Sequence, residues 1–136
     1  MTERIPIGAD GLEFQRVAYT PAMRVGDLVF VSGQVAMNDR GESVAPGDVL
    51  EQGRVAMRRL RDVLRAAGSD LSQVVKVTVF LTDRDQFPAL VQLRREWFSP
   101  PYPADTTVIV DSLVREECLI EIEAIATVAA STGETS

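Results

Sequence analysis

Two periodicities of hydrophobic residues run through the chain, one typical of strands and one typical of helices. Short apolar or alternating runs bounded by turn residues predict strands, because side chains alternate between the two faces of a sheet. Five such runs occur, at residues 16–20, 28–35, 74–82, 106–110 and 118–128. The segment PAMRVGD, residues 21–27, predicts a turn. Gly33 interrupts the second run, and a glycine there indicates a bulge or a close approach of another group.

Two longer segments show the spacing of amphipathic helices. The first begins at Asp48, which opens a D-x-x-E capping-box pattern, and ends before Gly68. Its apolar stripe consists of Leu50, Val55, Met57, Leu60, Val63, Leu64 and Ala67. The second helix follows a cap at Thr82 or Asp83 and continues to about Phe98, where the sequence SPPYP stops it.

The predicted order of elements is therefore β-β-α-β-α-β-β, which favours an α+β fold with two helices on one face of a sheet. No linker or repeat divides the chain, so we expect one domain over residues 1–136, with 128–136 as a flexible tail. Two helices leave the other face of the sheet uncovered. Self-association is the simplest way to cover it.

Composition narrows the chemistry that this fold can support. The chain carries a net charge of −6 and contains no histidine. Nonspecific nucleic-acid binding depends on Lys and Arg, so we expect no nucleic-acid partner and interpret the arginine clusters MRRLR and LRR as solvated helix faces. Because histidine is absent, any acid–base catalysis must use carboxylates, Tyr, Lys, a thiol or bound water. Zinc sites of the His-rich kinds are excluded for the same reason.

The sequence also indicates the cellular compartment. No apolar run approaches the ~18 residues of a membrane span. The N-terminal sequence MTERIPIGADG lacks the pattern of a signal peptide, and the single cysteine, Cys118, leaves no internal disulfide. We therefore expect a cytoplasmic protein without a membrane partner.

The last strand carries an anomaly. One of its faces is small and apolar, with Ile120, Ile122, Ala124 and Ala126, whereas the other contains Leu119, Glu121, Glu123 and Ile125. Two carboxylates in an apolar strand need an explanation, because a buried unpaired charge is costly. Either this face is solvated or paired with Arg or Lys, or one Glu lines a cleft and orients a water or exchanges a proton with a ligand.

Four segments resemble the Rid (reactive intermediate deaminase, YjgF-like) family: RVGDLVFVSGQV, LRDVLRAAGSDLSQVVKVTVFLTDRDQF, YPADTTVIV and LIEIEAIA. In order and spacing they cover most of residues 17–128. The resemblance implies a chorismate-mutase-like sheet with two helices on one face, and a homotrimer whose sheets close a barrel-like core. It also implies clefts between subunits in which imines and enamines of 2-amino acids are hydrolysed to 2-keto acids and ammonia, with no metal and no cofactor.

Residue by residue, the resemblance implies a site. The family's SGQ backbone, which contacts the ligand carboxylate, corresponds to Ser32, Gly33 and Gln34. The cleft tyrosine corresponds to Tyr19, and the glutamate that positions the attacking water corresponds to Glu121. A further backbone contact to the ligand falls on Thr107.

The chain differs from the family pattern in two places. Where typical members read P-A-R-S and clamp the substrate carboxylate with the arginine, this chain has Asp105. The family pattern F-x-x-x-N-x-x-Y on the second helix keeps Phe87 but has Val91 and Arg94 at its other positions.

Three interpretations of Asp105 follow. Asp105 and Glu121 share the cleft as acid and base and accept a substrate that is neutral or cationic where typical substrates are anionic. Alternatively, Arg94 enters the cleft and pairs with Asp105 or with the ligand, so that imino-acid hydrolysis survives. In the third, the protein is a ligand-binding or accessory trimer without catalysis. Asp105 could also simply cap the turn after Pro103.

Overall fold

The structure is a computed structural model that describes residues 2–9 and 11–128. Its strands are β1 (Arg4–Ile7), β2 (Ala22–Val25), β3 (Leu28–Gln34), β4 (Val74–Leu81), β5 (Ala104–Ile109) and β6 (Ile120–Thr127). Its α-helices are α1 (Leu12–Val17), α2 (Val49–Ala66) and α3 (Phe87–Trp97), and single 3₁₀ turns, η1 (Leu71–Gln73) and η2 (Arg84–Gln86), precede β4 and α3.

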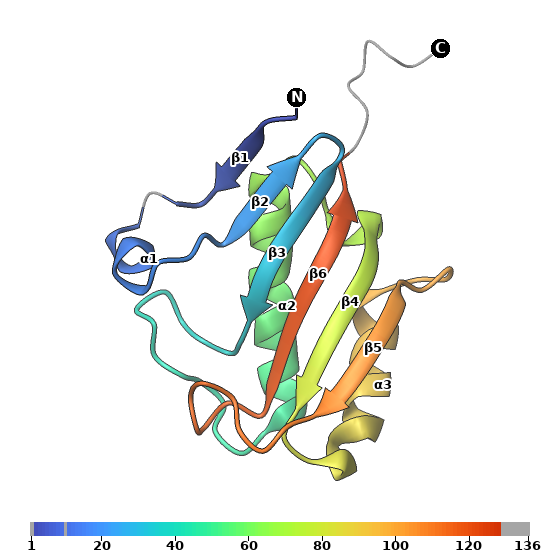
Figure 1. The fold of residues 1–136 in the computed structure, drawn as a ribbon. Helices are drawn as coiled ribbons and strands as arrows, with labels where there is room; N and C mark the ends of the chain where they lie inside the picture. The colour runs from blue at the N-terminus through green and yellow to red at the C-terminus, as the bar shows by residue number, and fades with distance from the viewer. Residues whose placement is uncertain (1, 10, 129–136) are drawn as a thin grey trace.

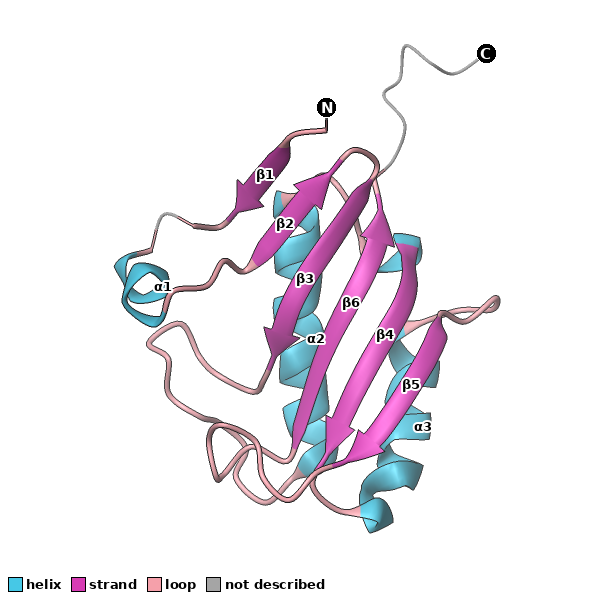
Figure 2. Cartoon of the chain, in the orientation of Figure 1, coloured by secondary structure: helices cyan, strands magenta, loops and turns pink. Residues whose placement is uncertain are grey.

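The six strands form one sheet in the order β1-β2-β3-β6-β4-β5. Only β4 and β5 run parallel; every other neighbouring pair is antiparallel. Helices α2 and α3 lie side by side on one face, and no described element covers the other face (Figures 1 and 2). This confirms the predicted α+β layer with two helices on one side.

The N-terminal part of the prediction was wrong. Residues 16–20 are not a strand, because α1 occupies the first of them and Ala18 ends that helix in the left-handed region at φ 60°. The predicted turn instead contains β2, which forms a tight hairpin with β3 across Gly26 at φ 57°. Strand β1 was missed altogether. It has only four residues, includes Pro6 and lies at the edge of the sheet, where proline is tolerated.

The core lies between the sheet and the helices. Val77, Val79 and Leu81 of β4 alternate inward and are at most 3% exposed, and Met57 and Leu60 of α2 pack above them. The predicted inner face of β6 is confirmed, since its four residues are buried: Ile120, Ile122, Ala124 and Ala126. Of the predicted flexible tail, residues 129–136 lie outside the described residues. Within the described chain, no helix is both long and apolar enough to cross a membrane.

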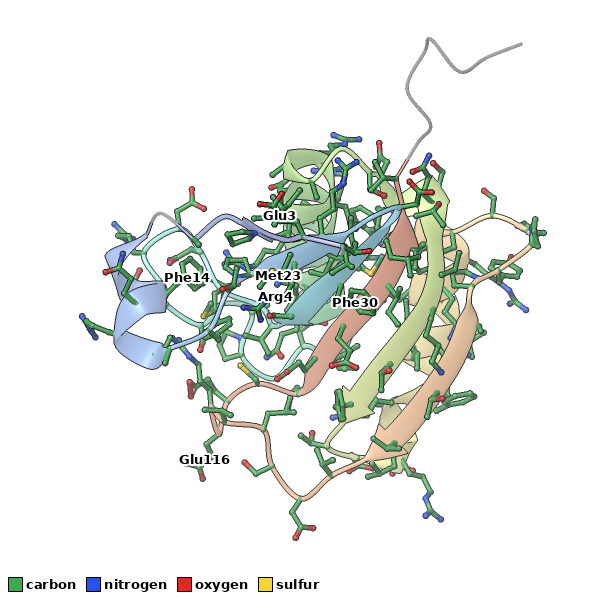
Figure 3. The ribbon with its side chains drawn as sticks, turned by 45° about the horizontal axis from the view of Figure 1, so that its top comes forward. Glu3, Arg4, Phe14, Met23, Phe30 and Glu116 are labelled. Carbon is green, nitrogen blue, oxygen red and sulfur yellow. The ribbon has the colours of Figure 1, made fainter. Side chains whose placement is uncertain are left out.

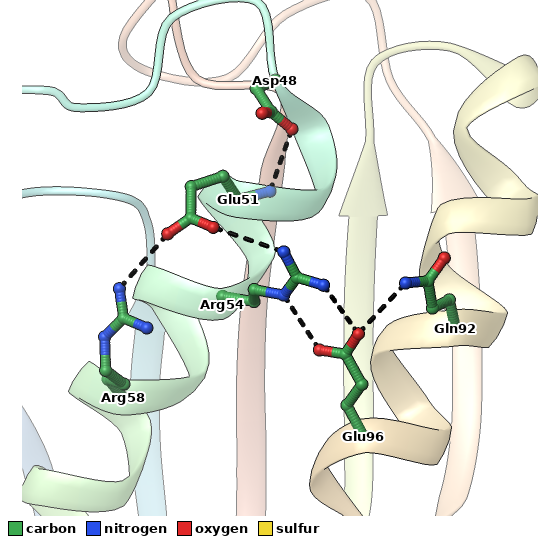
Figure 4. Close-up of polar contacts among 6 residues, drawn as sticks. All are labelled: Asp48, Glu51, Arg54, Arg58, Gln92 and Glu96. Atoms are coloured by element: carbon green, nitrogen blue, oxygen red, sulfur yellow. Dashed lines mark hydrogen bonds and ion pairs between the residues drawn. The ribbon is translucent and has the colours of Figure 1, made fainter.

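A polar network holds α3 against α2 (Figure 4). Asp48 caps α2 by accepting a hydrogen bond from the Glu51 backbone N–H at 3.1 Å, as predicted. The Glu51 side chain pairs with Arg54, which in turn binds Glu96 of α3 in a bidentate pair at 2.9 and 2.8 Å. The hydrogen bond from Arg54 lowers the pKa of Glu96 to about 2. The pair therefore stays charged at any ordinary pH and links α3 to α2.

Candidate functional site

Glu121 lies on the open face of the sheet, over the bulge in β3. The register places Phe80 beside it on β4, and the pairing of β3 with β6 shifts between Val31 and Gln34. A Cβ atom built on Gly33 would overlap Oε2 of Glu121 and lie only 2.8 Å from its Cδ. Glycine is thus required at position 33 so that the carboxylate can rest against the backbone, which explains the interruption noted in the sequence.

The carboxylate of Glu121 is half-buried and unpaired within the described part of the chain. Burial raises its pKa, and the like charge of Glu123 raises it further. No hydrogen bond or ion pair from a described residue offsets these two effects. Of the two explanations for the acidic face, the paired one does not hold for Glu121. A half-buried carboxylate with a raised pKa is suited to accept a proton.

Gly33 joins Glu121 to a neighbouring pocket. It contacts the Glu121 carboxylate, and it also lines a pocket of about 300 Å³ with Tyr19, Gln34 and residues of α2, a pocket whose lining does not include Glu121. Tyr19 is 46% exposed, and its ring packs edge-on against Phe14, with ring centroids 5.3 Å apart. Ser32 donates a hydrogen bond to the carbonyl of Thr20 at 2.6 Å, which ties the bulge to the segment that carries Tyr19. We call Tyr19, Ser32, Gly33 and Glu121 the bulge cluster.

Asp105 lies elsewhere. In the parallel ladder Asp105 is in register with Val77, and Thr107 with Val79, so both side chains face the helices. Arg94 of α3 binds the Asp105 carboxylate through Nη2 at 2.9 Å and Nε at 3.2 Å. The Asp105 side chain is 18% exposed, although the residue as a whole is more open because β5 is the edge strand.

Thr107 closes this arrangement into a ring. Its hydroxyl donates to Oδ1 of Asp105 at 2.6 Å and accepts from Nη2 of Arg94 at 3.0 Å. The guanidinium carbon of Arg94 also lies 5.4 Å from the centre of the Phe87 ring. Phe87 and Thr107 line a shallow hollow of about 760 Å³. We call Arg94, Asp105 and Thr107 the edge triad.

The bulge cluster and the edge triad do not meet within one copy of the chain. Strand β4 separates β6 from β5, and Glu121 projects from the open face whereas Asp105 projects toward the helices. The two carboxylates therefore cannot share a proton in one subunit. Of the interpretations drawn from the sequence, the structure contains the pairing of Arg94 with Asp105.

Sequence reasoning missed two aromatic residues of these sites. Phe80 stands opposite Glu121, and Phe14 supports the Tyr19 ring. The local pattern gave no signal for either role, because the register of β4 against β6 and the fold-back of α1 are not local properties of the sequence. Phe87, noted only as part of a family pattern, supports the arginine of the edge triad.

Comparisons with known proteins agree with this fold. The family model described as Endoribonuclease L-PSP matches residues 13–128. The chain is 43% identical over 110 residues to protein mmf2, mitochondrial, of Schizosaccharomyces pombe, covering 79% of this chain and 86% of that protein. It is 36% identical over 107 residues to a 2-iminobutanoate/2-iminopropanoate deaminase of Dermatophagoides farinae, covering 79% and 83%. The crystal structure of RidA from the Antarctic bacterium Psychrobacter sp. PAMC 21119 superposes with a TM-score of 0.77 at 30% identity, covering 90% of this chain and 94% of that one.

Proposed function

The chain belongs to the Endoribonuclease L-PSP family, also called the Rid or YjgF family, and we propose that it is a hydrolase that deaminates small imines or enamines in clefts between the subunits of a homotrimer. The observation that carries the proposal is the half-buried, unpaired carboxylate of Glu121 against Gly33. Relatives in this family are named 2-iminobutanoate/2-iminopropanoate deaminase, which supports imine deamination as the reaction type.

In this proposal Glu121 holds a water against the imine carbon and accepts its proton as the C–O bond forms. The resulting carbinolamine loses ammonia, with the nitrogen protonated, and leaves a carbonyl compound. One imine and one water thus give one ketone and one ammonia. Tyr19, Ser32 and Gly33 would contact the ligand on the side of Glu121, and Thr107 and Arg94 of a neighbouring subunit, beside Asp105, would hold the rest of it.

Two features of the single chain support the proposed assembly. The bulge cluster and the edge triad belong to one cleft only if different subunits contribute them, because they lie on opposite faces of the sheet. The uncovered face also presents large apolar side chains. Met23 and Phe30 are paired there across β2 and β3 (Figure 3), and Leu28, Phe30 and Val108 are each 37–43% exposed. Association through this face would cover them.

RNA cleavage, which the family description names, is not part of the proposal. The net charge is −6, and several arginines are already paired with carboxylates, among them Arg54 with Glu96 and Arg65 with Asp70. Phosphate binding needs free cationic groups. The proposed compartment is the cytoplasm; the name of one relative places that protein in mitochondria.

The test is ammonia release from 2-iminobutanoate, generated in situ by an amino-acid oxidase, with and without the protein. We expect the protein to accelerate hydrolysis over the spontaneous rate. Glu121→Gln should lower turnover by about a hundredfold or more, the range for losing a positioned base. Glu116→Gln, the same change at an exposed loop position, is the matched control. Ligand binding without any acceleration would favour the accessory trimer instead.

A further inference from the structure

The pocket of about 300 Å³ beside Gly33 has no role in the proposed hydrolysis. Its walls come from the N-terminal segment and α1, from the end of β3 and from one side of α2. Glu121 is not among its lining residues and contacts Gly33 from the open face of the sheet. Tyr19 and Gly33 border both places, but the pocket and the Glu121 carboxylate are separate.

Most of the pocket wall is apolar. Six of its side chains are Ile7, Phe14, Pro21, Val35, Met37 and Val63. Two charged residues of α2 also line the pocket, Arg59 and Asp62, which lie three positions apart and therefore on one side of the helix. An apolar pocket with a few charged or polar groups is the usual form of a small-molecule site, and this volume is at the lower end of the range for such sites.

Arg59 brings a positive charge to this pocket without a counter-charge from the described residues. The residue is half-buried, and its Nη1 donates a hydrogen bond to the carbonyl of Met37 at 3.2 Å, which fixes the guanidinium in the wall. Its Nε is buried and has no hydrogen-bond partner in the described part of the chain, and Nη2 has none there either. Because buried donors are normally paired, this arginine needs an explanation.

Arg61 of the same helix provides a contrast. Its Nε is also buried without a hydrogen bond from a described residue, but it lies 3.6 Å from Oδ1 of Asp62. Its guanidinium carbon lies 5.8 Å from the centre of the Trp97 ring. The carboxylate of Asp62 therefore pairs with Arg61, and within the described residues no ion pair joins it to Arg59.

This arrangement decides which ligand fits the pocket. One carboxylate can accept a hydrogen bond from Nη2 of Arg59 and supply the missing negative charge, while the rest of the molecule lies against the apolar wall. A second carboxylate would find no second cation among the lining residues and would be repelled by Asp62. An uncharged head group would leave the charge of Arg59 uncompensated.

We propose that this pocket is a second binding site, which takes small monocarboxylates with an apolar body and lies apart from the cleft in which imines are hydrolysed. Arg59 binds the carboxylate, and the apolar wall holds the body. The inference does not depend on the proposed function, because neither Arg59 nor this wall takes part in the hydrolysis.

The experiment measures the binding of three probes by isothermal titration calorimetry on the full chain in its native assembly. The probes are 4-methylpentanoate, its uncharged amide 4-methylpentanamide, and the dicarboxylate 3-methylglutarate, which has the same number of carbon atoms. We expect 4-methylpentanoate to bind about tenfold more tightly than either of the others, the discrimination that one hydrogen bond between charged groups produces.

Variants of the chain locate the binding. Arg59→Met keeps the apolar stem and removes the charge, so the affinity for 4-methylpentanoate should fall about tenfold, to that of the amide. Arg58→Met, the same change at the exposed neighbouring position, is the control and should bind as the wild type does. Glu121→Gln should also bind as the wild type does, because Glu121 does not line the pocket. Thermal melting checks that each variant folds, and Arg59→Gln replaces Arg59→Met if that variant does not.

Three outcomes would each overturn the inference. They are an absence of 4-methylpentanoate binding, equal binding of the acid and the amide by the wild type, and an acid affinity unchanged by the loss of Arg59. Binding that disappears in Glu121→Gln would place the probe in the cleft and would overturn it as well. A chain that binds 4-methylpentanoate through Arg59 but hydrolyses no imine would refute the deaminase proposal and leave the second site in place.

Discussion

Glu121 and Asp105 are two carboxylates of one sheet in opposite situations. Glu121 rests against the backbone of Gly33 without a described partner, and its pKa is raised. Asp105 is held by two bonds from Arg94 and one from Thr107. The difference arises from the face of the sheet on which each side chain lies. The unpaired carboxylate keeps the free lone pairs that proton transfer needs, whereas the paired one is fixed in place, and in the proposal it contributes to ligand recognition.

The largest effect is expected from displacing the Glu121 carboxylate from its contact with Gly33. In Gly33→Ala the new methyl group overlaps the Glu121 carboxylate, which must swing away. We expect imine hydrolysis to fall by about a hundredfold, because a displacement of about 1 Å at a catalytic group has that effect. Steady-state rates measure the change.

The fold should survive this substitution, since the overlapped atoms belong to the end of a flexible side chain. The double variant Gly33→Ala with Glu121→Gln provides the control, because two changes that act through one carboxylate are not additive. If their effects on the rate multiplied instead, Gly33 would act independently of Glu121.

A smaller effect is expected from removing the partner of Asp105. Arg94→Met leaves a mostly buried carboxylate without its cation, and we expect the free energy of unfolding to fall by about 1–2 kcal/mol, reduced from the cost of a fully buried pair by partial exposure. Chemical denaturation measures it. Arg94→Met combined with Asp105→Asn should recover much of the loss, and a double variant as unstable as the single one would refute the pairing as its cause.

Part of the fold and of the candidate site could be predicted from the sequence alone. Periodicity sufficed for β3, α2, β4 and β6, because each is long and its apolar residues repeat with one clear period. The alternation along β6 also identified its buried face, and thereby placed the carboxylate of Glu121 on the opposite face. It failed for β1 and α1, whose four and six residues are too short for a period to be distinguished.

The surroundings of Asp105 could not be read from local pattern at all. Its orientation depends on the parallel register of β5 with β4, and its partner comes from a helix eleven residues earlier in the chain. Resemblance to a family marked position 105 as unusual, but only packing of α3 on the sheet brings Arg94 to it. The same holds for the contact between Gly33 and Glu121, which joins residues far apart in sequence.

The smallest expected effect concerns pH. Because the pKa of Glu121 lies above its usual value of 4.5, activity should fall on acidification at a higher pH than an ordinary glutamate would give. Glu123→Gln removes the like charge and should shift this acidic limb to lower pH. The sign for stability is opposite: protonated Glu121 favours the folded state, so its contribution is present below pH 4.5 and is lost as the pH rises through the raised pKa.

A pH–rate profile of the wild type and of Glu123→Gln measures this shift. Asp111→Asn, an exposed position beyond β5, is a charge-matched control that should leave the profile in place. An acidic limb that stays fixed in Glu123→Gln would show that another group titrates.

The central claim is that the bulge cluster of one subunit and the edge triad of another form one cleft. Mixed oligomers of Glu121→Gln and Arg94→Met subunits, purified through two different tags, test it most directly. Each parent should be nearly inactive on the imine that the wild type hydrolyses best. In a cyclic trimer that contains both kinds of subunit, roughly one cleft in three takes its bulge cluster from an Arg94→Met subunit and its edge triad from a Glu121→Gln subunit, so about a third of the clefts are intact. The account predicts recovery of about that fraction of wild-type activity; mixed oligomers no more active than their parents would contradict it.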